Sequence, residues 1–359
     1  MIPRIDRRLL QNVDWLLLAA AAVILGLSAA SLATLGTHLM WRQLWWVGVG
    51  TVALLVVVSL DYRRLVRAAP ALYVVGIGLL VTVFVMGRVV LGARRWIHVG
   101  PFTVQPSELF KLIFVLTLAW IFTSRWARPL TPGAFALIGG ICAVPFAIIV
   151  KQPDLGTGLT LLPVLGAVLF GVGVRLKILG GLAAAALAVA PLAWFFLKDY
   201  QRERLLVFVD PFRDPLGTAY NVIQAKIAIG SGQLLGKGIS GATQSRLAFL
   251  PERHTDFIFA VFAEMWGFVG CMVLVAAYGL LVLRGFEIAA AAREPRGRLV
   301  ALGITALFAT QCLVNMGMVT GLLPIVGIPL PLMSYGGSSM VVSLMAVGLL
   351  LSIRMRQFH

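Results

Sequence analysis

The chain has 359 residues, of which 60% are hydrophobic and 12% charged, with a mean hydropathy of +0.95 and a formal net charge of +16. Soluble domains carry about 25% charged residues, so this composition excludes a soluble globular enzyme and leaves room for about ten membrane spans of about 20 residues each. The three cysteines, Cys142, Cys271 and Cys312, lie in separate apolar runs. Their spacing indicates neither a disulfide framework nor a zinc site.

Apolar runs separated by charged or Pro/Gly-rich breaks predict ten transmembrane helices. The expected fold is therefore an all-α integral membrane protein, one polytopic domain over residues 1–359. The first run, from Trp15 to about Leu35, is too long for a signal-peptide core and lacks a convincing cleavage site, so we expect an uncleaved signal-anchor. The predicted spans are about 15–35, 44–60, 70–86, 107–123, 133–150, 155–174, 178–197, 257–283, 299–320 and 338–353.

The cations are distributed unequally between the two sides of this layout. With the N-terminus inside, the inner segments hold sixteen cations and the short outer loops five. The sixteen are Arg4, Arg7, Arg8, Arg63, Arg64, Arg67, Arg125, Arg128, Arg175, Lys177, Arg284, Arg293, Arg296, Arg298, Arg354 and Arg356, and the five are Arg42, Arg88, Arg94, Arg95 and Lys151. The positive-inside rule then predicts that both termini are cytoplasmic. The net charge reflects mostly this topology, and no nucleic-acid partner is expected.

A long outer segment, 198–256, separates the seventh and eighth predicted spans. Apolar residues at helical spacing predict a short interfacial helix at 219–229. The glycine-rich stretch after it, GSGQLLGKGISGATQ, has two interpretations. It is either a plain loop or a cradle whose backbone amides, with Lys237 beside them, bind phosphate.

Four charged side chains near the outer face have both a structural and a functional interpretation. Asp256 comes directly before the eighth span, where it either caps the helix or accepts a proton from a hydroxyl in a partly dry cavity. Glu108 and Lys111 are three residues apart on one helical face, either as a structural ion pair or in a site. Asp154 follows Pro153 and either caps the sixth span or serves the site.

The stretch 315–339, NMGMVTGLLPIVGIPLPLMSYGGSS, is apolar enough for the membrane but too rich in Pro and Gly for one regular helix. Non-helical backbone at membrane depth is tolerated only where protein buries it or where it lines a watery cavity. The stretch ends in a dense polar set that includes Ser334, Tyr335 and Ser338. It therefore predicts a cavity inside the membrane protein.

Four motifs, in this order, resemble the SEDS family (shape, elongation, division, sporulation), and its elongation branch most closely. They are GARRWIHVGPFTVQPSELFK at 92–111, KQPDLGTG at 151–158, GKGISGATQSRLAFLPERHTD at 236–256 and the 315–339 stretch. Together they cover about a fifth of the residues. The resemblance implies a bundle of ten transmembrane helices with a large extracytoplasmic loop between spans seven and eight.

The resemblance also implies an activity: a peptidoglycan glycosyltransferase that polymerises lipid II on the outer face of the bacterial cytoplasmic membrane during cell elongation. The implied partners are lipid II, a class B penicillin-binding protein and the MreC and MreD elongation proteins. The family's catalytic carboxylate carries over onto Asp256, in LPERHTD, as general base. Outer cations would stabilise the departing lipid pyrophosphate, with Mg²⁺ or Mn²⁺ as a candidate bridging ion and no organic cofactor. The residues expected to bind substrate are Lys111, Glu108, Arg94, Lys237, Arg246, Arg253, Glu252, Asp154, Ser334 and Ser338, and no metal ligand is assigned.

Two other classes of protein stay open at this point. A lipid II flippase or other transporter also needs broken helices and intramembrane charges, although the distinctive polar groups here gather on the outer side. A non-catalytic membrane scaffold for the penicillin-binding protein would need the apolar spans but not Asp256. Replacement of Asp256 separates both classes from the enzyme.

Overall fold

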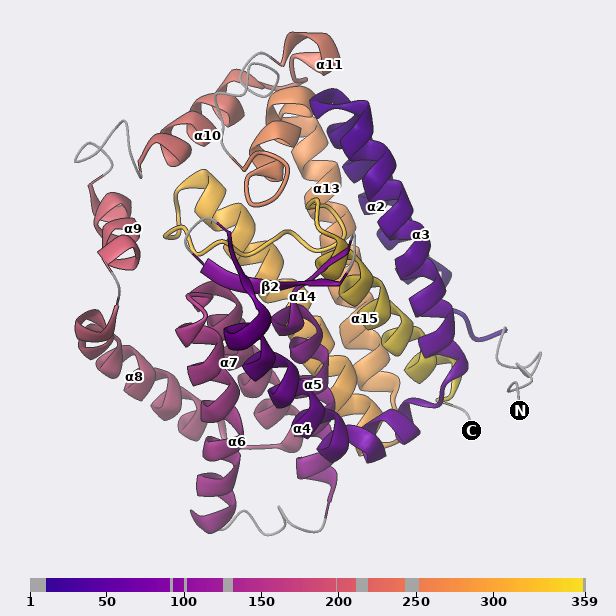
Figure 1. Cartoon of the computed structure of the whole chain (residues 1–359). Helices are drawn as coiled ribbons and strands as arrows, with labels where there is room; N and C mark the ends of the chain where they lie inside the picture. The colour runs from indigo at the N-terminus through magenta and orange to yellow at the C-terminus, as the bar shows by residue number, and fades with distance from the viewer. Residues whose placement is uncertain are drawn as a thin grey trace.

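A computed structural model describes residues 11–90, 93–99, 102–124, 132–197, 199–210, 219–242 and 252–357. Within these ranges, eight helices are long and apolar enough to cross a membrane, and they form the bundle of Figure 1. They are α2 (Trp15–Leu35), α3 (Thr37–Ser59), α4 (Tyr62–Met86), α5 (Pro106–Thr123), α7 (Leu155–Val172), α13 (Ile258–Ala291), α14 (Pro295–Thr320) and α15 (Gly337–Met355). Two further apolar helices, α6 (Pro132–Lys151) and α8 (Leu176–Ala193), lie at the edge of the bundle.

The bundle is built around α5, whose large side chains Phe110, Phe114 and Phe122 are at most 1% exposed. This helix packs against α4, α7, α14 and α15, while α3 packs along α15 and α13 packs against α2 and α14. Some of the helices begin and end at capping residues. Asp14 accepts a hydrogen bond from the backbone N–H of Leu17 at the start of α2, and Gly321 ends α14 in the left-handed conformation.

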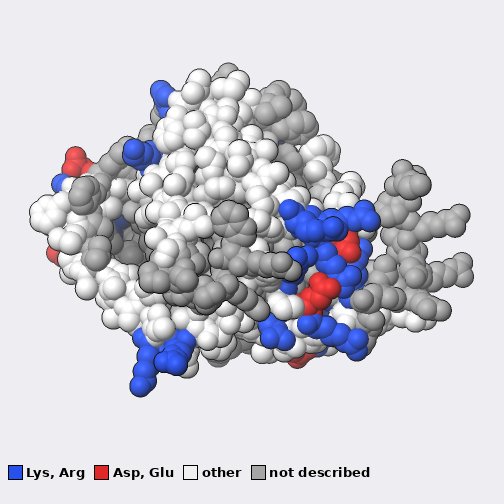
Figure 2. All heavy atoms as spheres, turned by 90° about the horizontal axis from the view of Figure 1, so that it is seen from below, with Lys and Arg blue, Asp and Glu red and all other residues white. Residues whose placement is uncertain are grey.

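The start of α2 and the end of α15 come together at one end of the bundle, which we call the basic end. Here the Asp14 carboxylate lies 2.6 Å from a guanidinium nitrogen of Arg284 at the far end of α13 and 3.9 Å from that of Arg354 on α15. Arg63 pairs with Glu294 at 3.0 Å on the same side. Figure 2 views this end and shows Lys and Arg side chains gathered there with acidic residues among them.

A small antiparallel sheet follows α4 at the end remote from Arg63, and in Figure 1 it lies above α4, α5 and α7; we call this side the sheet end. Its strands β1 (Arg88–Val90), β2 (Ala93–Val99) and β3 (Phe102–Val104) are ordered β1-β2-β3. Ile97 pairs with Val104 and Val99 with Phe102. The expected all-α fold left only a short outer loop between the third and fourth spans, so the sheet corrects that expectation at this point.

The long segment between α8 and α13 carries its own short helices at the sheet end. A 3₁₀ turn, η2 (Trp194–Phe196), leads into α9 (Asp199–Val209), followed by α10 (Tyr220–Ser231) and α11 (Gly238–Gly241). The helix expected at 219–229 is confirmed as α10. It packs against α13 and α14, so it lies on the bundle.

The helix α13 is broken at Gly267, whose φ of 63° and ψ of −162° are not helical. The amides of Phe268 and Val269, left without acceptors in their own helix, donate to the carbonyls of Gln233 and Leu234 at 2.8 and 3.0 Å. The loop after α10 therefore completes the hydrogen bonding of a membrane-spanning helix. Glycine residues in this loop permit the contact, because a Cβ on Gly232 or Gly236 would collide with the α13 backbone. This contact explains the glycine-rich stretch as a packed loop.

Candidate active site

A cavity of about 480 Å³ opens at the sheet end, between α3, β2, β3, the start of α7, α9, the turn before α13 and the stretch before α15. It is lined by Arg42, Trp46, Arg95, Trp96, Thr103, Gln105, Thr157, Arg204, Glu252, His254, Thr255, Asp256, Gly327, Pro329, Tyr335, Gly336, Gly337, Ser338 and Ser339. The irregular stretch within 315–339 thus lines a cavity, as its composition predicted.

The backbone that carries Asp256 is fixed by three successive hydrogen bonds. The carbonyl of His254 accepts from the Tyr335 N–H at 2.8 Å, and that of Thr255 accepts from the Ser334 hydroxyl at 2.7 Å. The carbonyl of Asp256 accepts from the side-chain amide of Asn315 at 3.0 Å. The irregular stretch and α14 therefore hold the turn before α13 from one side, which sets the direction of the Asp256 side chain.

Asp256 does not cap α13, because the N-cap residue is Phe257 and no side chain accepts a capping hydrogen bond there. The capping interpretation of the sequence is therefore wrong for this residue. Burial, and next the charge of Glu252, raise the pKa of Asp256 to about 6, against the opposing effect of Arg204 and Arg95. A carboxylate with this pKa is a stronger base than an ordinary aspartate, yet it is still ionised at neutral pH.

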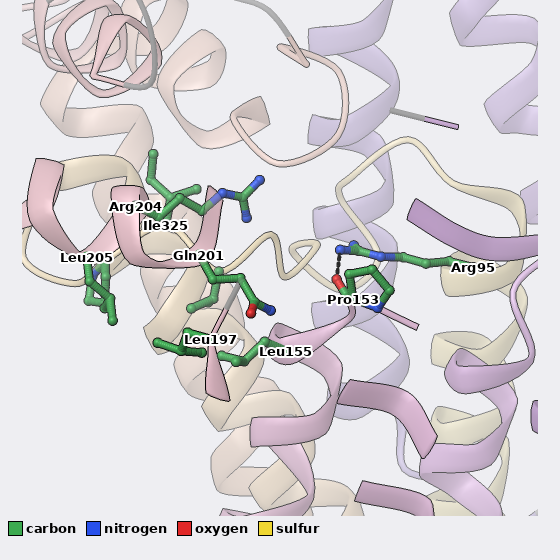
Figure 3. Close-up of a pocket in the computed structure, with 10 residues that line it drawn as sticks. Arg95, Pro153, Leu155, Leu197, Gln201, Arg204, Leu205 and Ile325 are labelled. Atoms are coloured by element: carbon green, nitrogen blue, oxygen red, sulfur yellow. Dashed lines mark hydrogen bonds between the residues drawn. The ribbon is translucent and has the colours of Figure 1, made fainter. Parts of the chain in front are cut away.

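Two guanidinium groups, Arg95 on β2 and Arg204 on α9, line the cavity together with Asp256. Both also line a smaller adjoining pocket of about 60 Å³, which they enter from opposite sides in Figure 3, above the apolar side chains of Leu155 and Leu197. Arg95 is oriented by a hydrogen bond to the Pro153 carbonyl. Cations placed beside a carboxylate and an apolar wall suit an anionic group attached to a lipid chain.

Asp154 is the N-cap of α7, where its carboxylate accepts from the Thr157 N–H at 3.3 Å. The same carboxylate accepts from Gln105 at 3.0 Å and Ser107 at 3.2 Å, and lies 3.7 Å from Arg95. The capping interpretation is thus confirmed. Asp154, which is 1% exposed, also joins β2, α5 and α7 beneath the cavity, so its link to the site runs through Arg95.

Glu108 and Lys111 form an ion pair of 2.8 Å within α5, and each is 2% exposed. Lys237 pairs with Glu264 of α13 at 3.6 Å, and its backbone N–H donates to the Glu264 carbonyl. Neither pair lines the cavity described above. The structure therefore places Glu108 and Lys111 in an ion pair within α5, and Lys237 in a pair that joins the loop after α10 to α13.

The remaining expected substrate ligands are distributed unevenly. Glu252 and Ser338 line the cavity, whereas Ser334 is buried and its hydroxyl is engaged with backbone at residues 255 and 330. Arg94 is exposed on β2 and donates to the Phe84 carbonyl. Arg253 is adjacent to the cavity residues in sequence but does not line it. The expected ligand Arg246 lies outside the described residues.

Several cavity residues were not selected from the sequence as site residues. Arg204 and Trp46 resemble an ordinary loop cation and an ordinary membrane tryptophan in sequence, and only the fold brings them to Asp256. Asn315, which does not line the cavity but holds the Asp256 backbone, had a usable signal, since a buried amide in the middle of an apolar helix needs hydrogen-bond partners. Tyr335 belongs to the polar set that predicted the cavity.

These observations define a multi-pass membrane protein with a polar cavity lined by two carboxylates, Asp256 and Glu252, and by arginine side chains. The family model of FtsW, RodA and SpoVE, described as a cell cycle protein, matches residues 8–359, so the chain belongs to this family. The resemblance to the SEDS family noted from the motifs is thereby confirmed.

Curated relatives match most of the chain. It is 43% identical over 318 residues to MrdB of Escherichia coli (strain K12), a peptidoglycan glycosyltransferase, covering 88% of this chain and 85% of MrdB. It is 37% identical over 319 residues to stage V sporulation protein E of Bacillus subtilis (strain 168), covering 87% and 86% of the two chains.

Two solved structures share the fold over nearly the whole chain. A chain in the structure of a peptidoglycan synthase complex superposes with a TM-score of 0.82 at 36% identity, covering 97% of this chain and 99% of that one. The rod shape determining protein RodA of Thermus thermophilus, as an aspartate-to-alanine mutant, superposes with a TM-score of 0.74 at 30% identity, covering 97% and 99%.

Proposed function

We propose that this protein is a peptidoglycan glycosyltransferase that polymerises lipid II, with Asp256 as the general base. The observation that carries the proposal is the placement of the Asp256 carboxylate. It lines a 480 Å³ cavity with Arg95 and Arg204, and it is held there by hydrogen bonds to its own backbone, away from any capping role. Relatives named as peptidoglycan glycosyltransferases support the same activity.

The reaction joins two lipid-linked saccharides. A sugar 4-hydroxyl of one attacks the anomeric carbon of the other, the bond to the lipid pyrophosphate breaks, and the hydroxyl proton passes to Asp256. Arg95 and Arg204 would stabilise the charge that develops on the departing pyrophosphate. A pyrophosphate stabilised in this way leaves without a general acid, so one carboxylate is sufficient, in contrast to the two carboxylates of glycoside hydrolysis.

We also propose that a divalent cation binds in the cavity together with the substrate. Among the described residues, no group of three or more His, Cys, Asp or Glu side chains forms a ready metal site. Mg²⁺ commonly binds through one or two carboxylates together with substrate phosphates and water. Glu252, which lines the cavity, is the carboxylate that would share Mg²⁺ or Mn²⁺ with the pyrophosphate, and the ion would supply charge neutralisation.

We further propose ten spans, with both termini on the cytoplasmic side of the bacterial inner membrane and the cavity outside. The eight long helices with α6 and α8 give this number, and the arginine residues at the basic end follow the positive-inside rule. Cysteine labelling at residues 64 and 238 should report opposite faces of the membrane. Labelling of both residues from the same side would contradict this topology.

We expect a class B penicillin-binding protein as the working partner and MreC and MreD in the same machinery. The superposition on a chain of a peptidoglycan synthase complex supports an assembly of this kind. No nucleic-acid partner is proposed.

The test uses the full chain, purified with its partner and supplied with labelled lipid II. We expect glycan ladders from the parental protein. Asp256→Asn keeps the shape of the side chain but cannot accept a proton, so polymerisation should fall at least about a hundredfold. Ladders that persist in Asp256→Ala would exclude the catalytic role, and a parental protein that makes no ladders would favour the scaffold or flippase.

A further inference from the structure

The first turns of α4 and α14 lie against each other at the basic end. Arg63 of α4 pairs at 3.0 Å with Glu294, the N-cap residue of α14, and the Tyr62 hydroxyl lies 3.5 Å from the same carboxylate. A Cβ added to Gly297, in the first turn of α14, would be 3.0 Å from the Tyr62 hydroxyl. These contacts hold the turn between α13 and α14 against the start of α4, so the cations of both segments share one surface.

Four arginine side chains of this shared surface form no ion pair with any described residue, and we call them the arginine surface. They are Arg64, Arg67, Arg296 and Arg298. All of them except Arg296 are exposed. The acidic groups nearby are already engaged, because Asp61 accepts a hydrogen bond from the Arg63 N–H and Glu294 pairs with the Arg63 guanidinium. Positive charge therefore exceeds negative charge here, among the cations that Figure 2 shows at this end of the molecule.

The face of α4 that carries Arg64 and Arg67 continues as an exposed apolar stripe. The two arginines are three residues apart, so they lie on one face of the helix. Ala71, Val74 and Val75 follow at helical spacing on the same face, and all three are exposed, Val74 to 70% and Val75 to 58%. Since α4 is long and apolar enough to cross a membrane, this stripe faces acyl chains, and the arginines lie beside it at the level of the lipid headgroups.

The length of α4 separates the arginine surface from the active-site cavity. The helix has 25 residues, which corresponds to about 37 Å along its axis. It begins at the basic end with Tyr62 and leads, after Met86, into the sheet whose strand β2 lines the cavity. The arginine surface and the cavity therefore belong to different leaflets of the membrane.

We propose that the arginine surface binds the phosphate of an anionic phospholipid in the leaflet away from the cavity, with the acyl chains along Val74 and Val75. Guanidinium groups match phosphate oxygens with paired hydrogen bonds, and clusters of cations at the ends of transmembrane helices bind anionic headgroups. An acidic protein would contact the arginines but leave the exposed apolar stripe of α4 without a role. The inference goes beyond the proposed function, because this lipid is not the substrate.

The test measures lipid binding to the purified full chain in detergent by native mass spectrometry, with phosphatidylglycerol and phosphatidylcholine as probes. Each cation near an anionic headgroup contributes about fivefold in affinity. The parental protein should therefore prefer phosphatidylglycerol, and Arg64→Gln combined with Arg67→Gln should weaken its binding roughly twentyfold. Both side chains are exposed, so thermal unfolding without added lipid should stay unchanged. Arg64→Lys combined with Arg67→Lys should keep most of the affinity, and high ionic strength should reduce the preference of the parental protein.

Arg175→Gln combined with Lys177→Gln is the matched control, since it removes two exposed cations of the turn between α7 and α8, which belongs to neither α4 nor α14. This control should bind phosphatidylglycerol as the parental protein does. Equal affinity of the parental protein for the two lipids, or an equal loss in the control, would overturn the inference. Equally tight, Arg64- and Arg67-dependent binding of glycerol 3-phosphate or of polyglutamate would overturn it too, because the surface would then serve a soluble phosphate or an acidic protein.

Discussion

Gly327 lies against the carboxylate of Asp256, so that a Cβ on residue 327 would be 3.3 Å from Oδ2 of Asp256 and 3.8 Å from Nη1 of Arg204. Its φ of +70° lies in the left-handed region, which favours glycine. Space and backbone conformation therefore both favour glycine at residue 327, which brings the cavity wall close to the Asp256 carboxylate.

Gly327→Ala should impair the enzyme in two separable ways. The left-handed conformation should lower stability by about 1–2 kcal/mol, and the added methyl group should displace Asp256 or Arg204 and lower kcat. Thermal unfolding in detergent and lipid II polymerisation measure the two effects. Parental kcat in a correctly folded Gly327→Ala protein would show that the carboxylate has more freedom than the structure indicates.

Activity should depend on pH through Asp256. With a pKa of about 6, the carboxylate is mostly ionised at pH 7 and becomes protonated below pH 6. The rate should therefore fall about tenfold per pH unit below pH 6 and reach a plateau above it. A pH–rate profile of polymerisation, recorded between pH 4.5 and 8 with unfolding monitored in parallel, tests this. A flat profile would mean that Asp256 is not the base.

The same pKa has a consequence for stability. The folded protein holds the Asp256 proton more tightly than the unfolded chain, whose carboxyl titrates near 3.8. The stability conferred by that proton is complete below pH 3.8 and lost as the pH rises through about 6. Asp256→Asn removes this loss, so the variant should unfold at a higher temperature than the parental protein at pH 7.5, and the gain should disappear near pH 4. An equal increase in unfolding temperature at both pH values would mean that the substitution acts through packing and not through the charge of residue 256.

Asn315 should act as a positioning residue. Its amide donates to the Asp256 carbonyl at 3.0 Å and to the Ile328 carbonyl at 2.8 Å, and thereby ties both walls of the cavity to α14. Asn315→Ala leaves two carbonyls without these donors, which should destabilise the fold by about 1–3 kcal/mol per group. We expect kcat to fall and the midpoint of the pH–rate profile to move when both are measured at a temperature well below that of unfolding. An unchanged midpoint with lower stability would make the role structural only.

The pair of Glu108 and Lys111 should matter for folding. Removing one partner leaves an uncompensated buried charge, so Lys111→Met alone should lower stability by about 3–5 kcal/mol. The double variant Glu108→Gln with Lys111→Met should lose much less. Thermal unfolding of Glu108→Gln, of Lys111→Met and of the double variant gives the coupling free energy between the two side chains. A double variant no more stable than the singles would show that the charges interact with something other than each other.

The sequence predicted the apolar helices and the cavity well, for definite physical reasons. Membrane depth requires long apolar runs, and the prolines and glycines of 315–339 exclude a regular helix there, so both features can be derived from local composition. Asp154 as a cap and Glu108–Lys111 as a pair follow from short spacings, and both interpretations are confirmed.

What the sequence did not predict depends on contacts between distant residues. Arg204 reaches Asp256 only because α9 folds over the cavity, and Lys237 faces Glu264 because the loop after α10 packs on the break in α13. The short strands of β1–β3 have no strong alternating pattern, so they read as a loop. The contacts of Arg204 and Lys237 join residues that are well separated in the chain, and single-sequence spacing carries no signal for them.

The break in α13 at Gly267 has a consequence for how the chain is made. The loop that supplies the carbonyls of Gln233 and Leu234 is synthesised before α13, so the acceptors already exist when the amides of Phe268 and Val269 emerge. The sequences of this loop and of α13 therefore have to match each other. A chimera that takes its outer loop from one relative and α13 from another would combine donors and acceptors from two different proteins in one set of backbone hydrogen bonds.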